Sequence, residues 1–203
     1  MSKVSKISRI SCIELPITKI EAERQAYANL GLINAEGFLQ PLMRDFMDEL
    51  GRDVLPRAKM NRLKKVASQI SKVVTPNTAC RSGCSHCCNI AAVITQTEAD
   101  ALAVASGRKA VKLGANVQLT ETRDKWFRVP CPFLKKGRCS VYEDRPLVCR
   151  LMFNLADNPY FCNTDIPPKE SHVTWLNLRQ LEDGYMKAFF RESWGDIRDF
   201  FPS

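Results

Sequence analysis

The chain has 203 residues, a formal net charge of +8 and nine cysteines. This length suits one ordinary domain, or a domain with a helical appendage, so no metal is needed to compensate for small size. There is no apolar run of about 18 residues to predict a membrane span, and residues 1–20 lack the apolar stretch and cleavage site of a secretory signal. We therefore expect a cytoplasmic protein, in which clustered cysteines bind metal or take part in catalysis rather than form disulfides.

Residues 1–76 are predicted to form a helical N-terminal region. Apolar residues recur at helical spacing over 38–50, and Pro41 indicates that this helix begins nearby or is kinked there. A second helix, with one apolar and one basic face, is predicted over 57–74. We interpret the basic face as a solvated surface rather than a nucleic-acid contact.

Residues 77–165 are predicted to form a cysteine-rich metal-binding domain. A short buried strand is expected at 89–95 and, after it, a helix that Thr97 caps and Gly107 ends. The sequence Lys-Lys-Gly at 135–137 predicts the turn of a β-hairpin.

Residues 166–203 are predicted to form a C-terminal helical segment that packs on the core. Its helix is expected over 171–191, with Gly184 as an unfavourable residue in the middle. The expected fold class is therefore α+β and rich in helix: helices flank a small, irregular, cysteine-rich centre that contains short strands.

Eight of the nine cysteines are clustered, and Cys12 is remote from them and expected to take no part. The clustered residues are Cys80, Cys84, Cys87, Cys88, Cys131, Cys139, Cys149 and Cys162. The C-x₂-C step from Cys84 to Cys87 lets one loop direct two sulfurs at one ion. In an extended segment, the adjacent Cys87 and Cys88 would point to opposite faces, so either they serve two sites, or one is a ligand and the other packs or bridges. The eight thiols could form two four-thiolate sites, or four could hold one iron–sulfur cluster while the others pack beneath it.

Other residues near the cysteines are expected to support the ligands. Basic side chains can offset thiolate charge or donate N–H groups to sulfur, and those close to cysteines in the sequence are Arg81, Lys135, Lys136, Arg138, Arg145 and Arg150. We assign Arg145 and Arg150 to support rather than catalysis. His86 is expected to face solvent or assist a ligand, and His172 to be structural.

Three pieces of the sequence together resemble a known family. They are the group Cys-x₃-Cys-x₂-Cys-Cys that begins at Cys80, the Cys-Pro-Phe-Leu that begins at Cys131, and the segment from Cys139 to Arg150, Cys-Ser-Val-Tyr-Glu-Asp-Arg-Pro-Leu-Val-Cys-Arg. This pattern is similar to that of the YkgJ-type cysteine-cluster family, CxxCxxCC, which is described as zinc- or iron-chelating. The resemblance covers residues 80–162 and implies a metal-binding role for their cysteines. Three residues, not two, separate Cys80 from Cys84 here.

Three functions compete on this basis. The first is a metal-binding protein that holds zinc or an iron–sulfur cluster and that could also bind a protein partner. The second is an iron–sulfur metalloenzyme, either redox-active or similar to a protein-modifying methyltransferase. The third is a basic zinc protein that binds nucleic acid. The motifs G-x-G-x-x-G, GxxxxGK[ST] and H-E-x-x-H are all absent, so the sequence leaves open whether the protein is an enzyme.

Overall fold

The computed structural model describes residues 15–114 and 119–202. Its elements in chain order are α1 (Lys19–Glu36), α2 (Leu39–Gly51), α3 (Pro56–Val74), the 3₁₀ helices η1 (Thr75–Asn77) and η2 (His86–Asn89), β1 (Val93–Thr95), α4 (Gln96–Ser106), α5 (Leu119–Lys125), β2 (Leu134–Lys135), β3 (Arg138–Cys139), η3 (Tyr142–Asp144), α6 (Leu147–Leu151), η4 (Tyr160–Cys162), α7 (Arg179–Ala188), β4 (Trp194–Asp196) and α8 (Ile197–Phe200). The predicted helix-rich α+β class is confirmed. None of the described helices is both long enough and apolar enough to cross a membrane.

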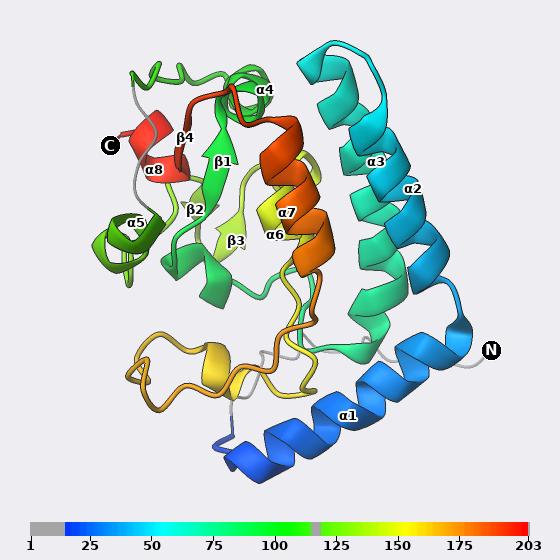
Figure 1. Ribbon diagram of the computed structural model, residues 1–203. Coiled ribbons are helices and arrows are strands. Elements are labelled where there is room, and N and C mark those ends of the chain that lie inside the picture. Colours follow the sequence, from blue (N-terminus) through cyan, green and yellow to red (C-terminus); the bar gives the residue numbers. More distant parts are fainter. Residues whose placement is uncertain (1–14, 115–118, 203) are drawn as a thin grey trace, which may run out of the picture.

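The N-terminal helices form one side of the molecule. α2 and α3 pack side by side as an antiparallel pair, and α1 crosses below them (Figure 1). Gly37 ends α1 in the left-handed conformation, with φ of 70°. Pro41 lies in the first turn of α2 and Pro56 is the first residue of α3, so both prolines occupy positions where the missing N–H costs nothing. The helices predicted over 38–50 and 57–74 are both confirmed, and each of their ends agrees with the structure to within one residue.

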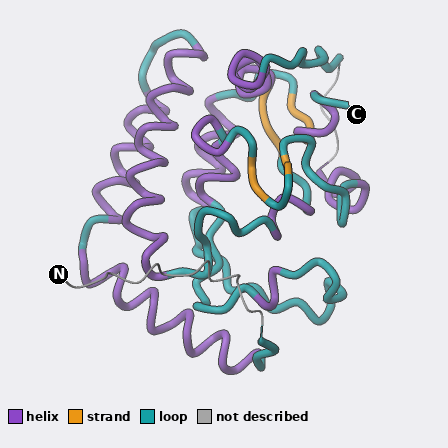
Figure 2. Tube along the Cα trace, turned by 180° about the vertical axis from the view of Figure 1, so that it is seen from behind, coloured by secondary structure: helices purple, strands orange, loops and turns teal. Residues whose placement is uncertain are grey.

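Two hydrophobic cores lie on either side of the cysteine region. The first joins α2 and α3 to α6, α7 and the chain around Phe153. The second joins β1, α4 and α8 to the hairpin of β2 and β3. β4 returns from the C-terminal end of the chain to pair antiparallel with β1, with Ile94 opposite Gly195 (Figure 2). Residues about a hundred positions apart therefore close the second core.

The hairpin was predicted correctly. Leu134 pairs with Cys139, and the turn residues Lys136 and Gly137 have φ of 50° and 71°. A two-residue turn of this kind requires positive φ at both positions, which glycine adopts without strain.

Two predictions around residue 95 need correction. The strand is limited to Val93–Thr95, because the chain up to Asn89 is a 3₁₀ helix. Thr95, not Thr97, caps α4: its hydroxyl accepts from the Glu98 N–H at 3.2 Å, and the Glu98 carboxylate accepts from the Thr95 N–H. These two reciprocal hydrogen bonds form a capping box. The prediction chose Thr97 because this second threonine, two residues later, is also a possible N-cap.

The C-terminal helix is shorter than predicted. α7 occupies only Arg179–Ala188, because the chain before it is extended: Trp175 forms a bridge with Asn154, and Leu176 N–H donates to the Phe153 carbonyl at 3.0 Å. Helix packing explains why a glycine occupies position 184 in the middle of α7. A Cβ at that position would lie 2.8 Å from Leu50 Cδ1, so α7 packs closely against side chains of α2, which would have to shift to admit a larger residue.

Candidate metal centre

Four separate segments bring the clustered cysteines together between the two cores. Seven thiols line one cavity of about 100 Å³: Cys80, Cys84, Cys87, Cys88, Cys131, Cys139 and Cys149. Cys162 lies beside this cavity and shares a hydrogen-bond partner with Cys80. All eight are free thiols, and Cys12 lies outside the described residues. Convergence from positions as distant as 80 and 149 was the central expectation, and the structure shows it.

The loop that carries the first four cysteines is a pair of tight turns. Cys84 N–H donates to the Arg81 carbonyl at 3.0 Å, and Gly83 has φ of 95°, which favours glycine. Cys87 and Cys88 belong to the 3₁₀ helix η2, and the adjacent Cys88 thiol raises the pKa of Cys87 well above its usual value. The premise that an extended chain separates them onto opposite faces is therefore wrong.

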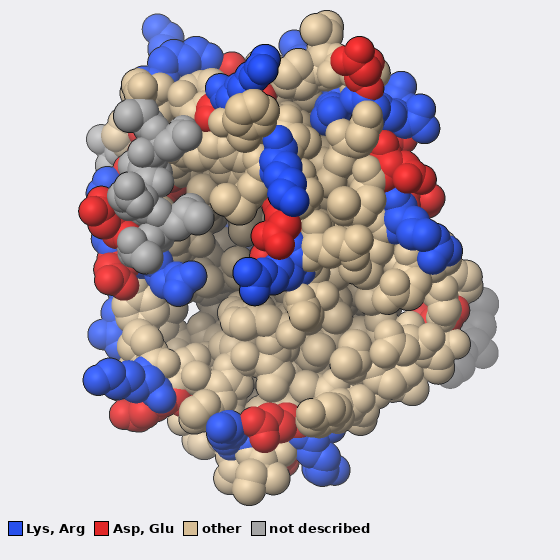
Figure 3. All heavy atoms as spheres, viewed as in Figure 1, with Lys and Arg blue, Asp and Glu red and all other residues tan. Residues whose placement is uncertain are grey.

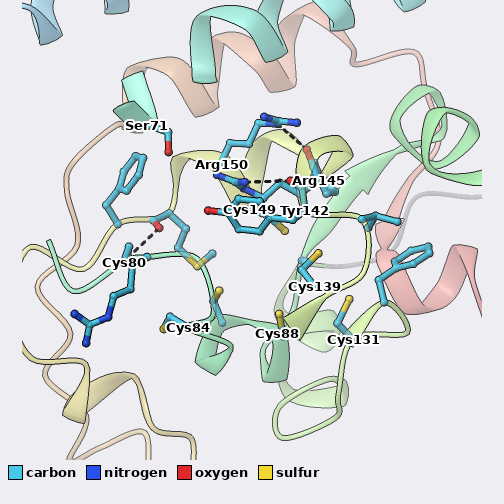
Figure 4. Close-up of a pocket in the computed structure, with 18 of the residues that line it drawn as sticks. Ser71, Cys80, Cys84, Cys88, Cys131, Cys139, Tyr142, Arg145, Cys149 and Arg150 are labelled. Carbon is cyan, nitrogen blue, oxygen red and sulfur yellow. Dashed lines mark hydrogen bonds between the residues drawn. The ribbon is translucent and has the colours of Figure 1, made fainter. Parts of the chain in front are cut away.

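Four of the thiols form what we call the inner group: Cys88, Cys131, Cys139 and Cys149. Their segments are directly joined, since Cys131 N–H donates to the Cys88 carbonyl at 2.7 Å and Cys139 pairs with Leu134 across the hairpin. Cys131, Cys139 and Cys149 also pack against the second core. Figure 4 shows the four side chains gathered on one side of the cavity.

The remaining four form the outer group: Cys80, Cys84, Cys87 and Cys162. Buried Asn154 connects two of them, because its backbone N–H donates to Cys80 Sγ at 3.2 Å and its side-chain amide to Cys162 Sγ at 3.3 Å. Cys162 also lies within electrostatic range of Cys80, Cys84 and Cys87. Cys80 and Cys84 lie opposite the inner group in Figure 4. Cys87 stands between the groups, since it also interacts electrostatically with Cys139 and Cys149.

Arg198 holds the framework of the inner group. Its guanidinium is 4% exposed and forms an ion pair with buried Asp196 at 2.8 Å. The same guanidinium donates to the carbonyls of Cys88 at 3.0 Å and Val129 at 2.6 Å, and Asp196 accepts from Ala92 N–H. One buried cation thus fixes the backbone on both sides of the contact between η2 and the chain that leads to Cys131.

The short helix α6 positions Cys149, and its own ends are anchored by side chains. Fully buried Glu98 accepts from the Leu147 N–H at 2.7 Å and from the Tyr185 hydroxyl at 2.8 Å. Burial raises the pKa of Glu98. Arg150 donates to the carbonyls of Arg145 and Glu143 and to Ser68 Oγ at 2.8 Å, so it ties α6 to η3 and α3.

Arg150 therefore supports the site through the backbone and not through a bond to sulfur. Arg145 is the cation closer to the thiols: it lies 3.9 Å from the centroid of the Tyr142 ring, and its charge favours the ionised forms of Cys87 and Cys139. His86 begins η2 and is not among the side chains that line the cavity. His172 packs edge-to-face on Phe161, as a structural residue would.

Six of the eight clustered thiols resist ionisation in the absence of a metal, and both groups contain such thiols. Burial raises the pKa of Cys80, Cys131 and Cys139, and raises that of Cys149 further. Burial and the neighbouring thiols raise the pKa of Cys162 to about 12. Several thiolates in one small cavity repel one another, so only a bound cation makes their joint ionisation favourable.

The donor set fits zinc or iron in chemistry. Soft thiolates select these metals, the thiols are reduced, and backbone and amide N–H groups already point at two sulfurs. Among the described side chains, no three of His, Cys, Asp or Glu form a ready-made ligand set. Thiols must therefore turn between staggered rotamers to converge on one ion. When bound, zinc would cross-link these segments, whereas an iron–sulfur cluster would also carry electrons.

Sequence reasoning missed Asn154, Arg198 and Asp196. The last two lie more than 45 residues after Cys149, and Asn154 follows it by five, so no ligand spacing points to them. One local signal was available: Asp196 and Asp199 form a capping box at the start of α8, and the Asp-x-x-Asp pattern is readable.

The comparison with known proteins gave a match for the part of the chain that contains the cysteine site. Residues 79–175 match the model of the CxxCxxCC family, which is described as "Putative zinc- or iron-chelating domain". No match was found among curated proteins or among solved structures. The matched segment contains all eight clustered cysteines together with Asn154, and excludes Arg198 and Asp196. The matched family is the one that the sequence pattern resembles.

Proposed function

We propose that this protein binds zinc or an iron–sulfur cluster through two adjoining sets of thiolates, in a reducing compartment such as the cytoplasm. The observation that carries the proposal is the lining of one small cavity by seven free thiols from three segments, 80–88, 131–139 and 149. Free cysteines are common in cores, but seven around one cavity, five of them with a raised pKa, have no advantage for packing. The match to a zinc- or iron-chelating family supports the same conclusion.

The division into two sets of four follows the contacts around each thiol, except for Cys87, which has neighbours in both groups and is assigned to the outer one because of its C-x₂-C spacing from Cys84. The inner group, Cys88, Cys131, Cys139 and Cys149, would hold one centre, and the outer group, Cys80, Cys84, Cys87 and Cys162, would hold the other. In this arrangement the C-x₂-C pair Cys84 and Cys87 serves one ion, and Cys88 serves the other. Four thiolates are the usual complement for structural zinc and for the common iron–sulfur clusters.

Metal analysis of the native protein tests this proposal. The full chain would be purified without oxygen, and its zinc, iron and sulfide would be measured beside its visible absorption spectrum. Two zinc ions per colourless chain would identify two zinc sites, and brown protein with iron and sulfide would identify a cluster. A folded chain that carries no metal and takes up neither zinc nor iron would refute the proposal.

The charge distribution gives nucleic-acid binding no comparable support. In Figure 3, Lys and Arg side chains are scattered over this face and accompanied by Asp and Glu. On α3, Arg62 lies 3.7 Å from Glu49, and Lys64 donates to the Asp144 carbonyl at 3.3 Å. Thiolates at the metal site would lower the net charge further, to about +4 for eight thiolates with two zinc ions.

A further inference from the structure

A second, larger cavity lies on the far side of α6 from the cysteines. Its volume is about 700 Å³, within the range of small-molecule sites. It lies between α7 and the segments of β1, α5 and α6, and Figure 3 shows this face hollowed near its centre. Its apolar lining includes Val93, Val148, Leu151, Trp175, Met186 and Trp194.

This cleft is distinct from the metal site but shares a wall with it. On α6, Leu147, Val148 and Leu151 face the cleft, whereas Cys149 and Arg150 face the cysteine cavity. Only the following residues, Met152 and Phe153, line both spaces. None of the eight clustered thiols lines the cleft, so a ligand there would not contact the proposed metal ligands.

The cleft leaves large apolar side chains in water. Trp175 is 46% exposed and Met186 45% exposed, and both line the opening. Tryptophan offers a flat apolar face for stacking, and methionine adapts to the shape of what it contacts. The interior therefore suits an apolar body of the size of one or two aromatic rings.

The charged residues at the mouth indicate where a polar end would lie. On the α7 side, Arg179 is 3.7 Å from Asp183, so these charges offset each other, and exposed Glu182 adds a negative charge. On the α5 side, Arg123 forms no ion pair or hydrogen bond with any described residue. An anionic group would be drawn to Arg123 and repelled by Glu182.

We infer that this cleft binds a small amphipathic anion, with its apolar body against Trp175 and Met186 and its carboxylate, sulfonate or phosphate beside Arg123. The inference does not depend on the proposed metal function, since it uses other residues and another cavity. It assigns the chain a ligand site whose back wall is the helix that carries Cys149.

Two fluorescent probes test it on the purified full chain. 8-Anilinonaphthalene-1-sulfonate is an aromatic anion, and N-phenyl-1-naphthylamine has a similar body without charge. We expect saturable binding of one sulfonate probe per chain, measured by fluorescence and calorimetry. Near-UV circular dichroism would verify that the protein stays native, because this dye also binds molten states. The absence of saturable binding to native protein would overturn the inference.

Variants then locate the site. Met186→Glu should weaken both probes by about tenfold, since it places a charge on the apolar wall. Arg123→Glu should weaken the sulfonate by about tenfold and leave the uncharged probe unchanged. The matched control is Phe190→Glu, since Phe190 is 65% exposed near Met186 but does not line the cleft. Equal losses in Phe190→Glu and Met186→Glu, or an unchanged sulfonate affinity in Arg123→Glu, would contradict the assignment.

Discussion

The inner and outer groups of cysteines differ in how the fold holds them. The inner thiols lie on the 3₁₀ helix η2 (Cys88), on the loop before β2 (Cys131), on β3 (Cys139) and on α6 (Cys149), and three of the four pack against the second hydrophobic core. Arg198, itself buried, fastens two of these segments to each other. The outer thiols lie on a loop (Cys80 and Cys84) and on the 3₁₀ helices η2 (Cys87) and η4 (Cys162), and Asn154 connects Cys162, through its side-chain amide, to Cys80, through its backbone N–H.

This difference suggests different dependence on the metal. The backbone of the inner group is fixed by hydrogen bonds and burial, so a metal there adds to an existing framework. The outer group has fewer such restraints, so its loops would owe more of their order to the metal itself. The predictions below separate the two groups, beginning with the largest effect.

Loss of a ligand should remove one centre and spare the other. In Cys149→Ser the inner centre should lose its metal, and in Cys162→Ser the outer centre should lose it. Structural zinc sites in small peptides bind with about 10–16 kcal/mol, so a single missing thiolate is a large loss. Elemental analysis of both variants beside the wild type measures this. If each variant loses all its metal, the two groups act as one centre, and the division proposed here is wrong.

Removal of the Arg198 charge should strongly destabilise the backbone framework of the inner group. Arg198→Gln leaves Asp196 buried without its partner, and breaking such a pair costs about 3–5 kcal/mol. Urea unfolding of the metal-loaded protein measures the cost. Arg179→Gln is the control, because its ion pair with Asp183 is exposed and should contribute little. Similar stability of the two variants would show that Arg198 does not organise this region.

The contrast between Arg198 and the hairpin shows what the sequence could reveal. The turn at Lys136 and Gly137 was predictable because its signal lies within four residues. The helices over 38–50 and 57–74 were predictable from the period of their apolar residues. The contacts of Arg198 have no such signal in the sequence. Besides Asp196, its guanidinium donates to carbonyls that lie about 70 and 110 residues away.

The errors also have physical causes. Trp175 fits the period of the C-terminal helix, but long-range pairing with Asn154 keeps that stretch extended. Cys87 and Cys88 were assigned to opposite faces on the assumption of an extended chain, and local 3₁₀ hydrogen bonds decide otherwise. The set of cysteines was readable from the sequence, whereas their pairing in space depended on tertiary contacts.

Loss of the Asn154 amide should weaken the outer group selectively. Asn154→Ala removes the donor to Cys162 but keeps the backbone N–H that donates to Cys80. Loss of a buried hydrogen-bond partner costs about 1–3 kcal/mol, and loss of a group that supports a ligand weakens metal binding about 10- to 100-fold. Competition with a chelator, followed for each bound metal, measures the effect. Equal weakening of both centres would contradict the assignment of Asn154 to the outer group.

High pH should reduce the difference in stability between the inner and outer groups of the metal-free protein, because burial raises the pKa of thiols in both groups. For a group whose pKa is higher in the folded state, stability is full below the pKa of the unfolded chain and is lost as pH rises above it. Chelated protein should therefore lose stability above about pH 9, by about 1.4 kcal/mol per buried thiol for each pH unit.

Urea unfolding of the chelated protein at pH 7 and pH 10 measures this loss. Cys149→Ala and Cys162→Ala should each reduce it by about 1–2 kcal/mol, since each removes one thiol whose pKa is raised. An unchanged pH dependence in Cys149→Ala alone would show that this inner thiol is hydrated in the metal-free protein. The buried framework proposed for the inner group would then require the metal as much as the outer loops do.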